Sequence, residues 1–220
     1  MSALNVFALC LLAGLLWLSG ELARWEVRAR ERCVRAVSLG LLAVNVLKYA
    51  LPPILGGPLV LPVEFSAAAY FTTPVLMLTR RRGLRCWAAY AGALAGACYY
   101  AAMVFAGEAI YGAYPEQNVL LSLLCHGCLL LLGLTTARTE RFEPRDILLL
   151  PLGTAAVAAR AALLRPWSGG GELLIYELMD AEPIRQTAPA LLPAYYAVIA
   201  ILLLLTVLCF MGLNKKVARL

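Results

Sequence analysis

The chain opens on an apolar run, ALNVFALCLLAGLLWLSG (residues 3–20), which is followed at once by the arginine-rich ELARWEVRARERCVR (residues 21–35). About 20 helical residues are needed to cross roughly 30 Å of hydrocarbon, so this run is close to the length of a membrane span. Basic residues collect on the cytoplasmic side of such a span. The order therefore predicts a first transmembrane helix with its N-terminus outside the cytoplasm. A cleavable signal peptide would carry its basic residues before the apolar run.

The same pattern continues to the end of the chain. Seven apolar segments have a suitable length, at residues 3–20, 36–54, 60–79, 84–106, 117–137, 146–164 and 190–213. They are too long and too uniformly apolar for the alternating strands of a membrane β-barrel. We predict an all-α, polytopic membrane protein, in which about seven transmembrane helices form a single domain over residues 1–220.

Basic residues occupy every second connection between these segments. Fifteen of the 19 Lys and Arg residues follow the first, third, fifth and seventh segments: Arg24, Arg28, Arg30, Arg32 and Arg35; Arg80, Arg81, Arg82 and Arg85; Arg138, Arg141 and Arg145; Lys215, Lys216 and Arg219. Because positive residues stay on the cytoplasmic side, this pattern predicts a cytoplasmic C-terminus.

The composition excludes several other classes of protein. The chain is 62% hydrophobic and 15% charged, whereas a soluble domain is closer to half apolar and a quarter charged. The net charge of +6 comes from short clusters between apolar runs and forms no nucleic-acid-binding patch. The seven cysteines lie in apolar runs or at cytoplasmic helix ends, which is not a disulfide framework. We expect a multi-pass protein of the cell membrane.

Polar residues inside a span usually face the interior of the helix bundle, because lipid cannot solvate them. In the segment 117–137, Asn118, Ser122 and His126 recur every four residues, and His126 is the only histidine. Three roles remain open for His126: a neutral side chain bonded to a neighbouring helix, a general base or acid, or a metal ligand. The sequence Cys125-His126-Gly127-Cys128 is not a zinc-site spacing, and we expect neither a metal nor a cofactor.

The segment 60–79 begins Leu61-Pro62-Val63-Glu64-Phe65-Ser66, and Ser66, Tyr70 and Thr73 form one stripe along it. Ser66 is a candidate nucleophile if His126 reaches it. Alternatively, it is a helix serine that bonds the carbonyl four residues earlier.

Further candidates come from two other segments, and the assigned topology places them in the outer half of the bilayer. Asn45 and Lys48 lie on one side of 36–54, with Lys48 near its outer end, and Arg160 lies near the outer end of 146–164. Arg160 either pairs with a carboxylate or binds a lipid phosphate or carboxylate. We predict that Lys48 or Arg160 contacts Glu64, because a carboxylate at this depth is disfavoured unless it is paired.

Two other features concern packing and the outer connections. Gly92 and Gly96 form a GxxxG pattern that favours close helix packing. The outer connection contains residues 172–180, which are either a short amphipathic helix at the interface or a plain loop.

At these residues the chain resembles the YwaF-type family of seven-helix membrane proteins. Residues 61–66 are similar to the family's Leu-Pro-Leu-His-Leu-Cys, and Leu124-Cys125-His126-Gly127 resembles its Ala-His-Gly segment. The stretch from Tyr176 to Pro183, followed by Pro193-Ala194-Tyr195, is similar to the family's sequence before helix seven. The resemblance would cover nearly the whole chain, and it adds Tyr176 to the candidate ligand-binding residues.

The resemblance implies one of two functions. The family includes a vertebrate relative described as a phospholipid acyltransferase, which has a cysteine at the position of Ser66 and a histidine at that of Glu64. A lipid acyltransferase or hydrolase that uses Ser66 and His126 is therefore one hypothesis. The other is a lipid-binding, transport or accessory protein, with Asn45, Lys48, Glu64, Asn118, Ser122, Arg160 and Tyr176 around an outward-facing polar cavity. We expect membrane lipids as partners, possible further membrane subunits and no nucleic acid.

Overall fold

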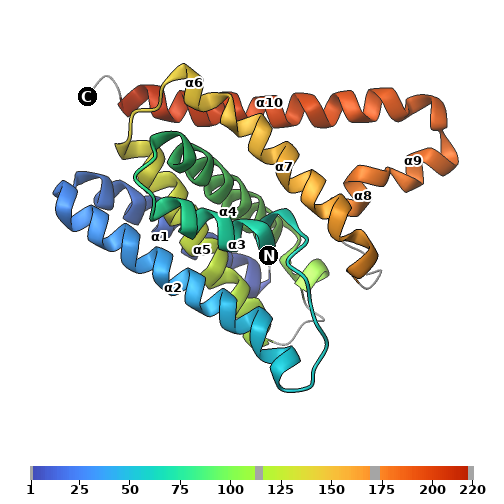
Figure 1. Cartoon of the computed structure of the whole chain (residues 1–220), viewed down its shortest axis with the longest axis horizontal. Helices are drawn as coiled ribbons and strands as arrows, with labels where there is room; N and C mark the ends of the chain where they lie inside the picture. The colour runs from blue at the N-terminus through green and yellow to red at the C-terminus, as the bar shows by residue number, and fades with distance from the viewer. Residues whose placement is uncertain (1, 112–115, 169–173, 218–220) are drawn as a thin grey trace.

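The computed structural model describes residues 2–111, 116–168 and 174–217, and all regular structure in these ranges is helical (Figure 1). The longer α-helices are α1 (Ala3–Arg24), α2 (Val27–Ile54), α3 (Phe65–Met77), α4 (Arg82–Tyr111), α5 (Glu116–Thr139), α7 (Leu149–Leu164) and α10 (Leu192–Val217). The shorter helices are α6 (Pro144–Ile147), α8 (Leu174–Asp180), α9 (Glu182–Thr187) and the 3-10 turns η1 (Arg165–Trp167) and η2 (Pro189–Leu191). The predicted all-α class is confirmed for these ranges.

Six helices are long and apolar enough to cross a membrane within the described ranges: Ala3–Arg24, Val27–Ile54, Arg82–Gly107, Glu116–Thr139, Pro144–Trp167 and Pro189–Asn214. The third predicted span, 60–79, is a helix only over the 13 residues Phe65–Met77. Those residues rise roughly 20 Å at 1.5 Å per residue, which is short of the hydrocarbon thickness. Pro58 and Pro62 lie in the preceding non-helical stretch, where each lacks the N–H of a helical hydrogen bond. The predicted count of seven spans is not confirmed.

The helix α2 begins at Val27, well before the predicted span at 36–54. The additional turns contain most of the arginines of the first basic cluster. Hydropathy marks only the part of a helix that lies in hydrocarbon, whereas arginine is itself a good helix former. The helix therefore continues beyond the predicted span with a strongly charged first section.

The centre of the bundle is the contact between α4 and α5. Within the most apolar 18-residue stretch of each helix, 72% of the residues of α5 and 56% of those of α4 are buried inside the protein, whereas the share for α1 is 17%. Glycines allow the two backbones to approach: a Cβ built on Gly96 would lie 2.8 Å from the His126 carbonyl oxygen, and one on Gly133 would lie 2.4 Å from the Ala93 nitrogen. The sequence prediction that Gly92 and Gly96 form a packing face agrees with this geometry, because a Cβ on Gly92 would lie 2.7 Å from the Leu129 carbonyl.

A buried arginine connects three helices at one end of this bundle. Arg85 of α4 donates to the backbone carbonyl of Met77 at 2.9 Å and to Glu31 of α2 at 3.0 Å. It also forms an ion pair with Glu140, just beyond the end of α5. The arginine-rich connections therefore lie together at the same end of the protein. This arrangement is consistent with the alternation in the sequence, but it does not identify the side of the membrane.

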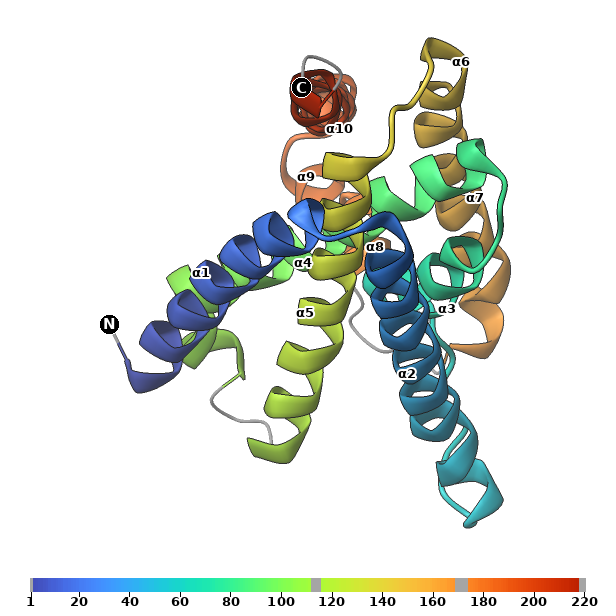
Figure 2. The same cartoon turned by 90° about the vertical axis from the view of Figure 1, so that its left-hand side faces the viewer.

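The helix α10 stands apart from the rest (Figure 2), and only 6% of its most apolar 18-residue stretch is buried inside the protein. Its contacts include a hydrogen bond between Thr206 and Tyr90 of α4, at 2.8 Å. The residues 174–180 before it form the short helix α8, while residues 172 and 173 of the predicted amphipathic stretch lie outside the described residues.

Candidate functional site

His126 lies at the centre of a buried aromatic cluster. The side chain is 5% exposed, and its Nδ1 lies 2.8 Å from the carbonyl oxygen of Ser122, one turn earlier on α5. The hydroxyl of Tyr70 on α3 lies 2.7 Å from Nδ1 and 3.1 Å from Nε2. The imidazole also stacks on the ring of Tyr99 from α4, with 3.7 Å between centroids and 6° between planes. Three helices thus fix the orientation of this one side chain.

The hydrogen-bond partners of His126 decide the role of one ring nitrogen. A carbonyl oxygen only accepts, so the contact with Ser122 requires Nδ1 to donate. The hydroxyl of Tyr70 lies within hydrogen-bond distance of both ring nitrogens, and it is closer to Nδ1. Both ring nitrogens therefore already have a polar partner.

Lys48 supplies a positive charge beside the Tyr70–His126 pair. Its Nζ lies 5.6 Å from the ring centroid of Tyr70 and 5.6 Å from that of Tyr49, within the range of a cation–π interaction. The residue is exposed toward the C-terminal end of α2, inside a segment long and apolar enough to span a membrane. An ammonium group in hydrocarbon is costly unless polar or aromatic groups surround it, so this position is unusual for a purely structural residue.

A groove of about 400 Å³ runs beside Lys48. Its lining comes from α2, the residue that follows α2 and one residue of α5: Val44, Leu47, Lys48, Leu51, Pro52, Leu55 and Leu121. Figure 2 shows α2 and α5 diverging from each other with distance from the α1–α2 turn. The groove is thus an apolar trough with one charged group, which suits an amphipathic molecule.

Asn45 lies one turn before Lys48 and is fully buried. Its Nδ2 donates to the Leu41 carbonyl at 2.9 Å and contacts the Cys125 sulfur at 3.6 Å. Its Oδ1 has no hydrogen-bond partner among the described residues. A buried amide oxygen of this kind is a ready acceptor for a water or a ligand hydroxyl.

Arg160 and Tyr176 stabilise the backbone near the start of α3. The Arg160 guanidinium donates to the carbonyls of Pro62 and Val63, the latter at 3.1 Å. Tyr176 of α8 donates to the carbonyl of Ala161 at 3.0 Å, and the guanidinium of Arg165 lies 4.9 Å from its ring centroid. These contacts attach the short helix α8 and the stretch before α3 to α7.

The remaining predicted residues are less closely associated with His126. Ser66 is half-buried on α3, one turn before Tyr70, and within the described ranges no hydrogen bond joins it to His126. Asn118 is exposed and Ser122 is half-buried, so the stripe on α5 becomes buried only toward His126. Glu64 is the residue before α3, and its predicted contact with Lys48 or Arg160 stays a prediction.

Tyr49 and Tyr99 were not among the predicted site residues, and Tyr70 was predicted only as a member of the stripe along 60–79. The spacing of Tyr70 from Ser66 was a usable signal, because both share the face of α3 that points toward α5. Nothing in the spacing of Tyr99 indicates that it stacks on His126, since that contact depends on the packing of α4 against α5. No group of three or more metal-binding side chains occurs in the part of the chain that the structure describes.

The six apolar helices found in the described part of the chain indicate a multi-pass membrane protein. No family model, curated protein or solved structure matches the chain. The resemblance to the YwaF-type family therefore rests on the quoted residues and stays a prediction.

Proposed function

We propose that this protein binds a lipid with an anionic head group in the groove beside Lys48, as a lipid-binding, transport or accessory protein of the cell membrane. The observation that carries the proposal is the single lysine in the apolar lining of this groove. An acyl chain matches the apolar wall, and a carboxylate or phosphate neutralises the ammonium group.

The Tyr70–His126 pair and Asn45 fit the same proposal as polar groups behind the lysine. The pair places a phenolic hydroxyl and an imidazole close to the ammonium group of Lys48. The unpartnered Oδ1 of Asn45 would accept from a head-group hydroxyl or from a bridging water. Together they would distinguish a polar head group from a plain hydrocarbon chain.

The topology also belongs to the proposal. We place the N-terminus outside and the C-terminus in the cytoplasm, with α3 and the non-helical stretch before it making a seventh crossing. The alternating basic connections support this orientation. Membrane-impermeant thiol reagent added outside to a variant without native cysteines should label Ser168→Cys and spare Arg81→Cys, and the reverse pattern would invert the orientation.

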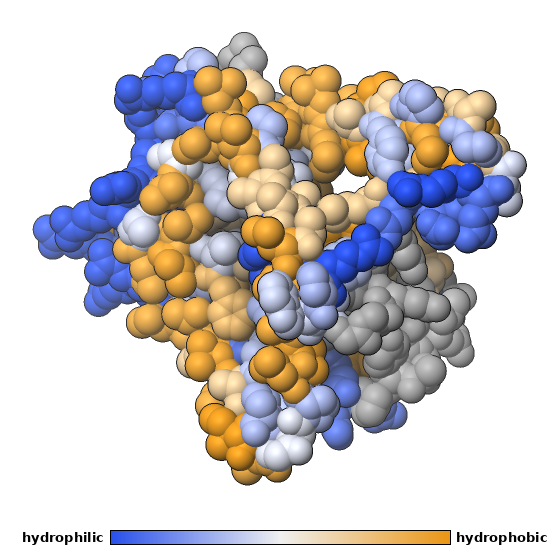
Figure 3. Space-filling view, turned by 45° about the vertical axis from the view of Figure 1, so that its right-hand side comes forward, coloured by the Kyte–Doolittle hydropathy of each residue, from blue (hydrophilic) through white to orange (hydrophobic). Residues whose placement is uncertain are grey.

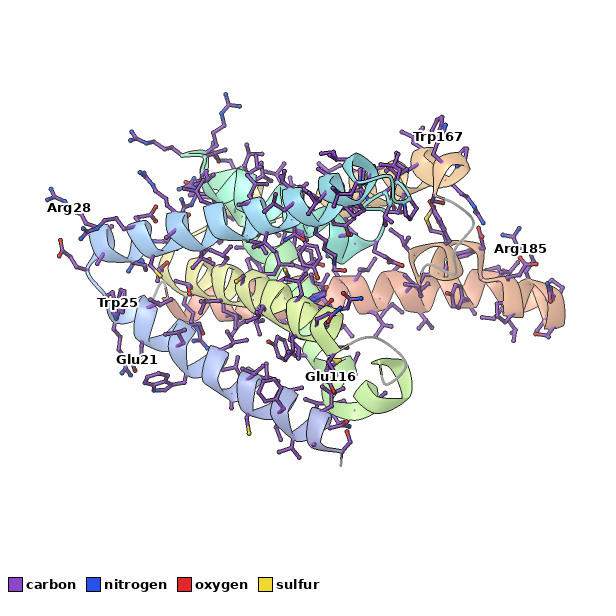
Figure 4. All side chains as sticks on the ribbon, turned by 90° about the horizontal axis from the view of Figure 1, so that it is seen from below. Glu21, Trp25, Arg28, Glu116, Trp167 and Arg185 are labelled. Carbon is purple, nitrogen blue, oxygen red and sulfur yellow. The ribbon has the colours of Figure 1, made fainter. Side chains whose placement is uncertain are left out.

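Binding in the groove can be tested with a photoactivatable fatty acid and the purified full chain in nanodiscs. We expect crosslinks to map to the groove residues of α2 and to Leu121. Lys48→Gln should lower the affinity by about tenfold, the size expected for one charge-assisted contact. Arg185→Gln is the matched control, because this exposed residue of α9 (labelled in Figure 4) makes no ion pair among the described residues. Equal affinities of the two variants would refute the role of Lys48.

The alternative, acyl transfer or hydrolysis through Ser66 and His126, has less support in this geometry. Nδ1 and Nε2 of His126 are engaged by Ser122 and Tyr70, so activating Ser66 would require His126 to exchange partners. Incubation of the purified protein with membrane lipids, followed by mass spectrometry of the products, separates the two functions. Products lost in both Ser66→Ala and His126→Gln would favour the enzyme.

A further inference from the structure

Three arginines form a stripe at the other end of α2. Arg28, Arg32 and Arg35 follow one another at intervals of four and three residues, so they lie on one side of the helix. All three are exposed, and together with Glu31 they line a cavity of about 470 Å³. The stripe is about 10 Å long at 1.5 Å per residue.

The positive charge of this cavity is not neutralised by the residues that the structure describes. Glu31 is the only acidic residue among those described as lining it, and both carboxylate oxygens of Glu31 accept from Arg85, at 3.0 and 3.4 Å. Within the described ranges, no acidic side chain forms an ion pair with Arg28, Arg32 or Arg35. Arg82 and Arg85 at the same end each bind two acidic residues. The stripe therefore differs from Arg82 and Arg85 in having its guanidinium groups available, and it differs from the exposed Arg80, Arg81 and Arg141 in lying on one side of a single helix.

The same side of α2 continues as an apolar surface. Leu39 is 56% and Val46 47% exposed, and at 100° per residue both point within about 20° of the direction of Arg28. Figure 3 shows one group of hydrophilic residues at the left of the view beside a largely hydrophobic face, and a second hydrophilic group at the right. Figure 4 shows Arg28 extending outward at the α1–α2 end, where Trp25 is 47% exposed at the turn between the two helices. An exposed Trp is typical of the head-group region of a bilayer.

We propose that the stripe is a binding site for the phosphate of an anionic phospholipid. The phosphate would lie among Arg28, Arg32 and Arg35, where guanidinium groups bind its oxygens in pairs. The acyl chains would lie along Leu39 and Val46. The continuity of the basic stripe with this apolar face selects a lipid over a soluble phosphate, because a soluble anion would use only the arginines. Lys48 is roughly 20 Å further along α2, so this site is separate from the groove and does not depend on the proposed function.

The test uses the full chain in detergent and measures lipid binding by native mass spectrometry. The probes are phosphatidic acid, phosphatidylcholine and inorganic phosphate. The variant is Arg28→Gln/Arg32→Gln/Arg35→Gln, and the matched control is Arg80→Gln/Arg81→Gln/Arg141→Gln. The control also removes three exposed arginines that form no ion pair in the described part of the chain, from connections at the same end. Since all six side chains are exposed, circular dichroism without lipid should be unchanged in both variants.

We expect phosphatidic acid to bind the wild type and the control variant with equal affinity. It should bind the stripe variant at least tenfold more weakly, because each basic residue near the membrane surface adds substantially to the attraction for an anionic lipid. Lys48→Gln should retain this binding, which separates the site from the groove. Equal losses in the two triple variants would overturn the proposal in favour of general charge attraction. Equal binding of phosphatidylcholine, or competition by inorganic phosphate at equal concentration, would also overturn it.

Discussion

Gly96→Ala should destabilise the protein by separating α4 from α5. A Cβ at this position would lie 2.6 Å from the Leu130 Cβ, 2.8 Å from the His126 carbonyl oxygen and 2.9 Å from the Leu130 Cα. Two of these atoms belong to the α5 backbone, so the helices must move apart by about 1 Å to reach ordinary contact distances. Overpacking of this kind costs about 1–3 kcal/mol, and the higher helix propensity of alanine returns at most about 1 kcal/mol.

Gly40→Ala is the matched control, because a Cβ on this exposed residue of α2 would meet no atom within 4 Å. It should leave the stability unchanged or raise it by up to about 1 kcal/mol. The free energy of unfolding, measured by titration with a denaturing detergent, should therefore be about 1–3 kcal/mol lower for Gly96→Ala than for Gly40→Ala. The reasoning is refuted if the two variants shift alike, or if Gly96→Ala is the more stable of the two.

Two further predictions concern ion pairs. Arg85→Gln should lower the stability by on the order of 3 kcal/mol, because it leaves Glu31 and Glu140 without the arginine that pairs with both. The exposed Arg81→Gln should change the stability by less than about 0.5 kcal/mol. Thermal unfolding in detergent compares the two variants, and similar melting temperatures would contradict the ion-pair network. The Arg165 guanidinium holds the pKa of Asp180 below its ordinary 3.8, so the pair contributes fully above pH 3.8 and is lost as the pH falls through the folded-state pKa. The rate of amide hydrogen exchange in α8, corrected for its intrinsic pH dependence, should therefore increase on acidification in the wild type. The increase should be much smaller in Asp180→Asn. An exchange rate that does not change with pH in the wild type would show that the pair does not hold α8.

Part of the candidate site could be predicted from the sequence. A histidine in the middle of an apolar helix is expected to be buried, because lipid cannot hydrogen-bond it, and His126 is buried. Its partners could not be predicted in the same way. Ser66 and Tyr70 share one face of α3, and which of them meets His126 depends on how far α3 is displaced along α5. Hydropathy carries no information about that displacement, because sliding a helix by one turn keeps the same apolar face buried.

The sequence by itself determined the membrane class, the all-helical structure and the alternate placement of basic connections. These properties follow from the cost of exposing backbone and charge to hydrocarbon, and each segment is subject to that cost independently of its neighbours. The tertiary structure decided that Lys48 faces Tyr49 and Tyr70 beside an apolar groove, and that Glu31 is occupied by Arg85 while Arg28, Arg32 and Arg35 are left available. Such contacts join residues on different helices, and their geometry is set by the close α4–α5 packing and by the non-helical stretch before α3, which no local pattern encodes.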